Sequence, residues 1–132
     1  MPIRVEHIVN AVDLNTASES IAANFRFRGV VPKRITLYVQ IVETQDNGNP
    51  TTTLTVEFSP DGGTTLITTD KLLTHGGTDA PVASVAYTST VDDIVSIPPE
   101  DVVNYIRVTM SGSSDMDAGD HHVVDVWLVY AY

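Results

Sequence analysis

The sequence has no cysteine in its 132 residues. A disulfide framework, a thiolate metal site and a cysteine nucleophile are therefore excluded. The absence is typical of a protein that folds in a reducing compartment, and a chain of this length suits one domain with its own core. We expect a single β-sandwich domain over residues 1–132, with residues 1–20 forming an extended N-terminal arm or an edge strand.

Long apolar runs are also missing. The longest, residues 126–131, is far shorter than the roughly 20 residues that a membrane-spanning helix needs. Near the start of the chain, Arg4, Glu6 and His7 interrupt any run that would serve as a signal peptide. The sequence therefore predicts neither a secretion signal nor a membrane partner.

Basic residues are scarce. Seven lysines and arginines stand against 17 acidic residues, a formal net charge of −10, and so acidic a chain repels nucleic-acid phosphates. Five of the seven basic residues precede position 35, where only three acids occur, so this segment has a net charge of +2 (5 − 3). If the two regions lie on different surfaces, the molecule is electrically polar. Otherwise these basic side chains protect exposed strand edges.

Alternation of apolar and polar side chains recurs along the whole chain, which is rich in valine, threonine and isoleucine. No stretch of ten or more residues has a helical period, so a parallel α/β sheet is disfavoured. The pattern predicts an all-β, antiparallel two-sheet sandwich of the jelly-roll or Greek-key type, with about eight strands. The clearest strands are residues 3–7, 21–28, 35–42, 54–59, 105–110 and 123–132.

Two segments carry strong turn chemistry. Residues 45–50 hold an Asn-Gly pair followed by proline. Residues 59–63 place Pro60 where φ is preset, and Gly62 and Gly63 where φ has to be positive. The second segment predicts a hairpin between Leu54 and Ile67.

The last predicted strand, residues 123–132, is apolar on nearly both faces. It is either a central strand covered by loops or a subunit interface, where tryptophan and tyrosine are enriched. Trp127, Tyr130 and Tyr132 are therefore candidate interface residues.

Residues 115–122 hold the best candidates for a metal site. Asp115, Asp117 and Asp120 are weak candidate ligands for a hard cation such as calcium, which prefers several converging oxygens. His121 and His122 are adjacent, so on a strand they point to opposite faces and cannot readily chelate one ion. We predict a solvated acidic loop with no metal and no cofactor.

Catalytic motifs are lacking. The chain has four histidines and many acids and serines, but neither a Gly-x-Ser-x-Gly elbow nor a glycine-rich phosphate loop between a strand and a helix. We predict a protein that is not an enzyme. Because flat aromatic rings stack on sugars, a carbohydrate-binding or cell-surface-binding sandwich remains an alternative.

Two pieces of the chain resemble small virion proteins of tailed bacteriophages. They are residues 53–65 (TLTVEFSPDGGTT) and residues 105–112 (YIRVTMSG). In those proteins a strand runs into an Asp-Gly hairpin, and a later strand of the second type leads to a closing strand. The family often has an aromatic residue shortly after the turn, whereas this chain has Leu66. The resemblance implies a structural protein of a phage particle, namely a head decoration or cement protein, with a tail or neck component as the alternative.

The resemblance also implies partners. It indicates a homo-oligomer, with a trimer as the first expectation, bound to the major capsid protein or other virion proteins. The location implied is the virion, assembled in the host cytoplasm. On this interpretation an acidic partner surface contacts the basic side chains Arg26, Arg28, Lys33 and Arg34.

Overall fold

The computed structural model describes residues 2–28, 31–74, 80–99, 102 and 104–132. This part of the chain contains no α-helix and hence no helix able to span a membrane. It forms ten β-strands: β1 (Ile3–Leu14), β2 (Ser20–Arg26), β3 (Arg34–Thr44), β4 (Thr52–Phe58), β5 (Ile67–Thr68), β6 (Leu73–Thr74), β7 (Val85–Tyr87), β8 (Val91–Ile97), β9 (Tyr105–Gly112) and β10 (His121–Ala131).

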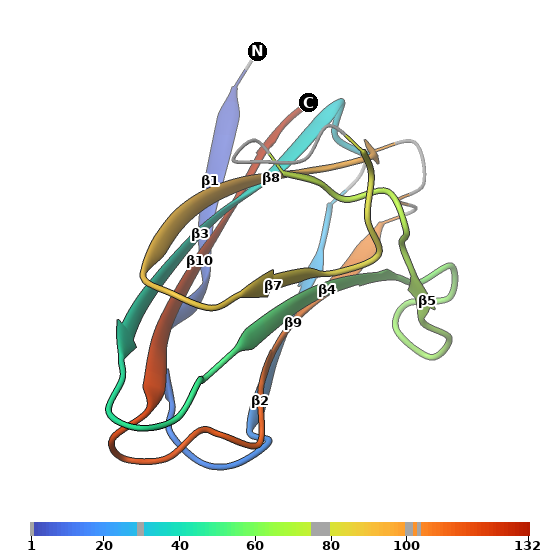
Figure 1. Ribbon diagram of the computed structural model, residues 1–132. Coiled ribbons are helices and arrows are strands. Elements are labelled where there is room, and N and C mark those ends of the chain that lie inside the picture. The colour runs from blue at the N-terminus through green and yellow to red at the C-terminus, as the bar shows by residue number, and fades with distance from the viewer. Residues whose placement is uncertain (1, 29–30, 75–79, 100–101, 103) are drawn as a thin grey trace.

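Two antiparallel sheets face each other across one core (Figure 1). Sheet A has the strand order β1-β10-β3-β8-β6, and sheet B has the order β2-β9-β4-β5, with β7 also paired to β4. The first long strand pairs with the last (β1 with β10), the second with the second-last (β2 with β9), and likewise β3 with β8 and β4 with β7. This nested pairing of eight strands is the jelly roll. The prediction of an all-β, antiparallel sandwich is confirmed.

The core follows from period-two alternation. In β3, β4, β9 and β10 every second side chain points inward and is shielded from water, as the complete burial of Leu37, Leu54, Ile106 and Leu128 shows. The intervening side chains face outward, so each sheet has an outer face whose composition the core does not constrain.

The predicted hairpin after Leu54 is present as β4 and β5, which pair over two positions. Gly62 (φ 78°) and Gly63 (φ 107°) supply the positive φ angles that the turn requires. The Ser59 hydroxyl accepts hydrogen bonds from the amides of Asp61 (3.3 Å) and Gly63 (2.7 Å). The Thr65 amide donates to the Asp61 carboxylate (2.7 Å), and this bond lowers the pKa of Asp61 below its ordinary value.

β1 occupies the edge of sheet A and contains a bulge. Its register with β10 shifts between His7 and Val9 and again between Val9 and Val12. At the bulge Ala11 adopts a φ of 48°, a conformation that a non-glycine residue holds only at some cost. The bulge lets both halves of the strand pair with β10 while it changes which side chains point outward.

Candidate interaction surface

The outer face of sheet A, near the chain termini, is built mostly from apolar side chains of β1, β10, β3, β8 and β6. Its side chains lie in register across the sheet: His7 is opposite Trp127, which is opposite Tyr38, and Tyr38 is opposite Ile94. We name this surface the apolar face. It comprises Ile3, Val5, His7, Arg34, Thr36, Tyr38, Leu73, Ile94, Ser96, Trp127, Val129 and Ala131.

Large apolar side chains on this face are in contact with water. Ile3 is 68% exposed and Val5 is 58% exposed, and Tyr38, Leu73 and Ile94 are also classed as exposed. These five are most of the exposed large hydrophobic residues in the described part of the chain; the other two are Val42 and Ile67. The named residues of the apolar face include no acid, but two acidic side chains lie next to them on the outer face of sheet A, Asp125 on β10 and Asp92 on β8. Apolar surface of this kind is typical of sites that bind another protein or a ligand.

A polar cluster holds the centre of the apolar face in place. The rings of His7 and Trp127 stack with their centroids 4.4 Å apart and their planes 7° from parallel. The His7 Nε2 atom lies 2.8 Å from the Asp125 carboxylate, which also accepts a hydrogen bond from the Ala11 amide at 2.8 Å. Asp125 therefore stabilises the bulge of β1 and orients the ring that packs on Trp127.

A shallow groove of about 690 Å³ runs across the apolar face towards the start of β3. Its apolar lining includes Tyr38, Ile94 and Val129, while Lys33 and Arg34 supply basic side chains at its rim. The structure thus places three predicted interface residues, Lys33, Arg34 and Trp127, on or beside one surface.

Of the other predicted interface residues, only Tyr130 also lines this groove. Arg26, Arg28 and Tyr132 line a separate cleft between β1 and β2. Tyr130 points inward, is only 7% exposed and packs edge-on against Phe27 with ring centroids 5.1 Å apart. Burial raises the pKa of Tyr130. Tyr130 is therefore part of the core and has little side chain left for a partner.

The outer face of sheet B is different in composition. We name it the polar face, and its outward side chains come from β2, β9, β4, β5 and β7. Hydroxyl groups dominate it, and Asn24 accepts hydrogen bonds from the Tyr105 hydroxyl (2.7 Å) and the Arg107 Nε (2.8 Å). Its members are Ser20, Ala22, Asn24, Arg26, Thr53, Thr55, Glu57, Thr68, Ala86, Tyr105, Arg107, Thr109 and Ser111.

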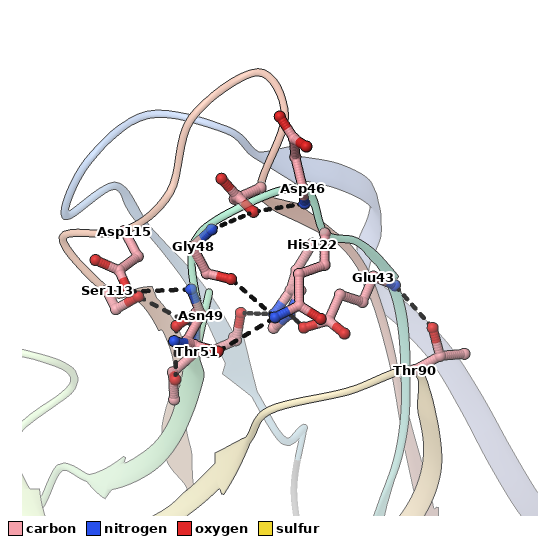
Figure 2. Close-up of polar contacts among 12 residues, drawn as sticks. Glu43, Asp46, Gly48, Asn49, Thr51, Thr90, Ser113, Asp115 and His122 are labelled. Carbon is pink, nitrogen blue, oxygen red and sulfur yellow. Dashed lines mark hydrogen bonds and ion pairs between the residues drawn. The ribbon is translucent and has the colours of Figure 1, made fainter.

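The three aspartates proposed as weak cation ligands accept hydrogen bonds from backbone amides. Figure 2 shows one of them, Asp115, beside Asn49. Asp120 accepts from the amides of Asp46 (2.7 Å) and Gly48 (3.0 Å), and the bond from Asp46 is the main cause of its lowered pKa. Asp117 accepts from its own loop, and Asp115 accepts from the Asn49 amide. In the described segments no three histidine, aspartate or glutamate side chains are grouped as metal ligands would be. These carboxylates fold the loops between β3 and β4 and between β9 and β10.

Sequence reasoning missed a buried polar link between the sheets. His122, on β10, is completely buried, and its Nδ1 atom lies 2.6 Å from the Thr52 hydroxyl of β4. Its Nε2 atom lies 3.1 Å from the Glu43 carboxylate of β3 (Figure 2). Because an ionised carboxylate only accepts, Nε2 carries the hydrogen that bonds Glu43, and in the neutral ring Nδ1 accepts from Thr52.

This hydroxyl–imidazole–carboxylate order is that of a hydrolytic triad, but its burial prevents that chemistry. Thr52 is completely buried, so its oxygen cannot meet a carbonyl group of a substrate. The three side chains instead join sheet B to two strands of sheet A. The adjacent His121–His122 pair was the available sequence signal, since alternation required one of the two rings to point inward.

No family model and no curated protein matches this chain. Among solved structures, a chain from the structure of infectious bursal disease virus, Gx strain, is similar with a TM-score of 0.52 and 15% identity, covering 99% of this chain and 32% of that chain. A chain of the infectious bursal disease virus VP2 subviral particle gives 0.49 and 14%, with the same coverage of 99% and 32%. This protein thus spans about a third of the solved chains that it matches. The first likeness shows the fold: this β-sandwich also occurs as part of a protein of a virus particle.

Proposed function

We propose that this chain is a non-enzymatic structural protein of a virus particle, and specifically a capsid decoration or cement protein of a tailed phage that binds the major capsid protein. The observation that carries the proposal is the apolar face, where the large apolar side chains of Ile3, Val5, Tyr38, Leu73 and Ile94 are exposed on a chain of net charge −10. The fold shared with a viral protein and the resemblance of residues 53–65 and 105–112 to phage virion proteins support the same assignment.

The chemistry of the apolar face suits a protein partner. Trp127 and Tyr38 lie side by side at its centre, and aromatic side chains of this kind dominate the energetics of protein interfaces. Arg34 and Lys33 at the rim favour a partner whose surface is apolar with acidic margins. On this proposal the shell protein covers Ile3 and Val5 when the particle assembles.

A sugar ligand is less well supported by the same surface. The His7 ring covers one face of the Trp127 indole at 4.4 Å, and the indole is therefore not open on both sides for stacking against a pyranose. A tail or neck component would use the apolar face in the same way as a decoration protein. The two roles differ in the structure that the protein binds, which is the capsid shell for a decoration protein and the tail or neck for the alternative.

The test is cosedimentation of the purified protein with empty shells assembled from the major capsid protein encoded in the same genome. Val5→Glu places a charge on the apolar face at a 58%-exposed position of the edge strand β1, and we expect it to weaken shell binding by about tenfold or more. Trp127→Ala is expected to weaken binding by about 2 kcal/mol or more, the typical cost of removing an aromatic anchor.

Ala22→Glu is the matched control. It adds the same charge at an exposed position of β2, the edge strand of sheet B, as Val5→Glu adds on β1, the edge strand of sheet A. Its shell binding should equal that of the wild type. Absence of wild-type binding to shells, together with binding to assembled tails or necks, would reassign the protein to those structures, and binding to none of them would refute a virion role.

A further inference from the structure

Basic and acidic side chains of the described residues gather at opposite ends of the sandwich. Figure 1 shows both chain termini at one end, where β1 begins, β2 ends and β3 begins. Because the strands alternate in direction, this end collects five of the seven lysines and arginines of the chain. We name it the basic end, and its members are Arg4, Arg26, Arg28, Lys33 and Arg34.

The opposite end is formed by the loops over residues 15–19, 45–51, 88–90 and 113–120, which contain no lysine or arginine. We name it the acidic end. With the strand residues next to these loops it carries the carboxylates of Asp13, Glu19, Glu43, Asp46, Asp92, Asp93, Asp115, Asp117 and Asp120. The separation of charge that the sequence left open is therefore realised in the fold.

Among the described residues, no carboxylate forms an ion pair with a lysine or arginine of the basic end. Each ion pair between two described residues has a histidine as its cation. The Arg26 guanidinium donates to the Gly62 carbonyl at 3.2 Å, and Arg4 and Arg28 have no carboxylate within ion-pair distance among the described residues. Guanidinium groups left free in so acidic a chain are available to a carboxylate from another molecule.

Three of these arginines line one cleft of about 590 Å³ between the edge strands β1 and β2. Arg4, Arg26 and Arg28 supply its positive charge, and Tyr132 with Phe25 forms an aromatic wall. The Tyr132 hydroxyl donates to the Arg28 carbonyl at 3.4 Å, and the Tyr132 ring packs perpendicular to that of Tyr130 with centroids 5.7 Å apart. The cleft also contains Glu6 and Asn24, so its charge is mixed but predominantly positive.

We propose that this cleft binds carboxylates at the acidic end of a second copy of the chain, so that copies associate head to tail. Guanidinium groups bind carboxylates in a bidentate manner, and an aromatic wall strengthens such contacts by limiting the access of water. The contact is heterologous, since different surfaces of the two copies meet, and it builds a closed ring or an open row according to the angle between copies. It uses the ends of the sandwich, and the apolar face remains free.

The acidic end offers carboxylates for this contact. The side chains of Asp46 and Asp92 are exposed and have no hydrogen-bond or ion-pair partner among the described residues. The neighbouring carboxylates of Asp115, Asp117 and Asp120 already accept hydrogen bonds from loop amides, which holds the end in a fixed shape. A second copy therefore presents a preorganised acidic surface to the cleft.

The experiment is sedimentation velocity of the full chain at about 20 mM and about 500 mM salt, because exposed charges are strongly screened at the higher value. We expect association at low salt that reverts to monomer at high salt. Arg28→Glu should raise the dissociation constant by about tenfold or more, and Asp46→Lys should have a similar effect. A wild type that stays monomeric at low salt overturns the proposal without any variant.

Mixing the two variants gives the decisive result. Arg28→Glu retains an intact acidic end and Asp46→Lys retains an intact basic end, so the mixture should associate although neither variant does so alone. The double variant Ala22→Glu/Thr53→Glu lowers the net charge by as much as Arg28→Glu but on the polar face, and it should associate like the wild type. Failure of the mixture to associate, or an equal loss in this control, refutes head-to-tail binding. Shell binding by Arg28→Glu should persist, which separates this test from that of the decoration role.

Discussion

The apolar face and the polar face are built by the same kind of strand from nearly opposite side chains. At the centre of sheet A the outward positions are His7, Trp127, Tyr38 and Ile94, in register. The equivalent positions across sheet B are filled by threonine, asparagine, arginine and glutamate. A sheet face in contact with water favours polar side chains, which accounts for the composition of the polar face. The apolar face is the surface that we propose a protein partner covers.

The two faces lie on opposite sides of the sandwich because the two sheets pack on one core. His122 joins the two sheets through its bonds to Thr52 and Glu43. We predict that His122→Ala lowers the free energy of unfolding by about 2–4 kcal/mol, because it opens a cavity and leaves the buried Thr52 hydroxyl and the Glu43 carboxylate without their partner. Urea unfolding followed by Trp127 fluorescence measures this change.

The adjacent histidine supplies the control for that variant. His121 faces outward and pairs with Asp13 at 2.7 Å near the surface, so His121→Ala should cost less than about 1 kcal/mol. Equal losses for the two variants would mean that the buried link contributes nothing.

The outer face of each sheet has a polar residue that accepts two hydrogen bonds, Asp125 on sheet A and Asn24 on sheet B. The stability lost when each is replaced by alanine compares the two faces. Asp125→Ala on sheet A removes the acceptor of His7 and of the Ala11 amide, and we expect a loss of about 1–2 kcal/mol with loosening of β1. Asn24→Ala on the polar face removes the acceptor of two exposed side chains and should cost less. Hydrogen exchange of the Ala11 amide should rise in the first variant and remain unchanged in the second.

We expect a fall in pH to weaken the hydrogen bonds of the loops and turns before it affects the two sheet faces. Backbone amides lower the pKa of Asp120 and of Asp61 in the folded state. Because the folded pKa lies below the unfolded value of about 4, the stability from these groups is complete above that pH and is lost as the pH falls through the folded pKa. Asp120→Asn should therefore reduce stability at neutral pH and flatten its decline below about pH 4, as urea midpoints measured across pH would show. An unchanged slope would contradict this assignment.

The smallest effect is expected from making the apolar face resemble the polar face. Val5→Thr keeps a β-branched side chain at a 58%-exposed strand position, and the free energy of unfolding should change by less than about 0.5 kcal/mol. Binding of a hydrophobic dye to the folded protein should fall, while Thr55→Ser on the polar face should leave it unchanged. A large loss of stability would show that Val5 packs against this chain itself.

Much of the fold was predictable because alternation and turn chemistry are local. The strands around Leu37, Leu54 and Ile106 follow from period-two patterns, and the turn before Ile67 follows from Pro60, Gly62 and Gly63. A local pattern tells which side chains of a strand share a face, but not which of the two faces is buried. In residues 123–132 both sets of alternate positions are apolar, so the sequence offered Trp127 and Tyr130 equally as interface residues, whereas packing put Tyr130 in the core and Trp127 outside.

The sequence by itself determined the β class, the positions of the main strands, the absence of thiol chemistry and the strong negative charge. Only the tertiary structure decided which side chains lie together and on which surface of the sandwich. Nested pairing brings Thr52, Glu43 and His122 together from three strands, and it gathers Arg4, Arg28 and Arg34 at one end of the sandwich. The physical reason is that side-chain alternation is set by neighbouring residues, whereas the partner of each side chain is set by strands far apart in the sequence.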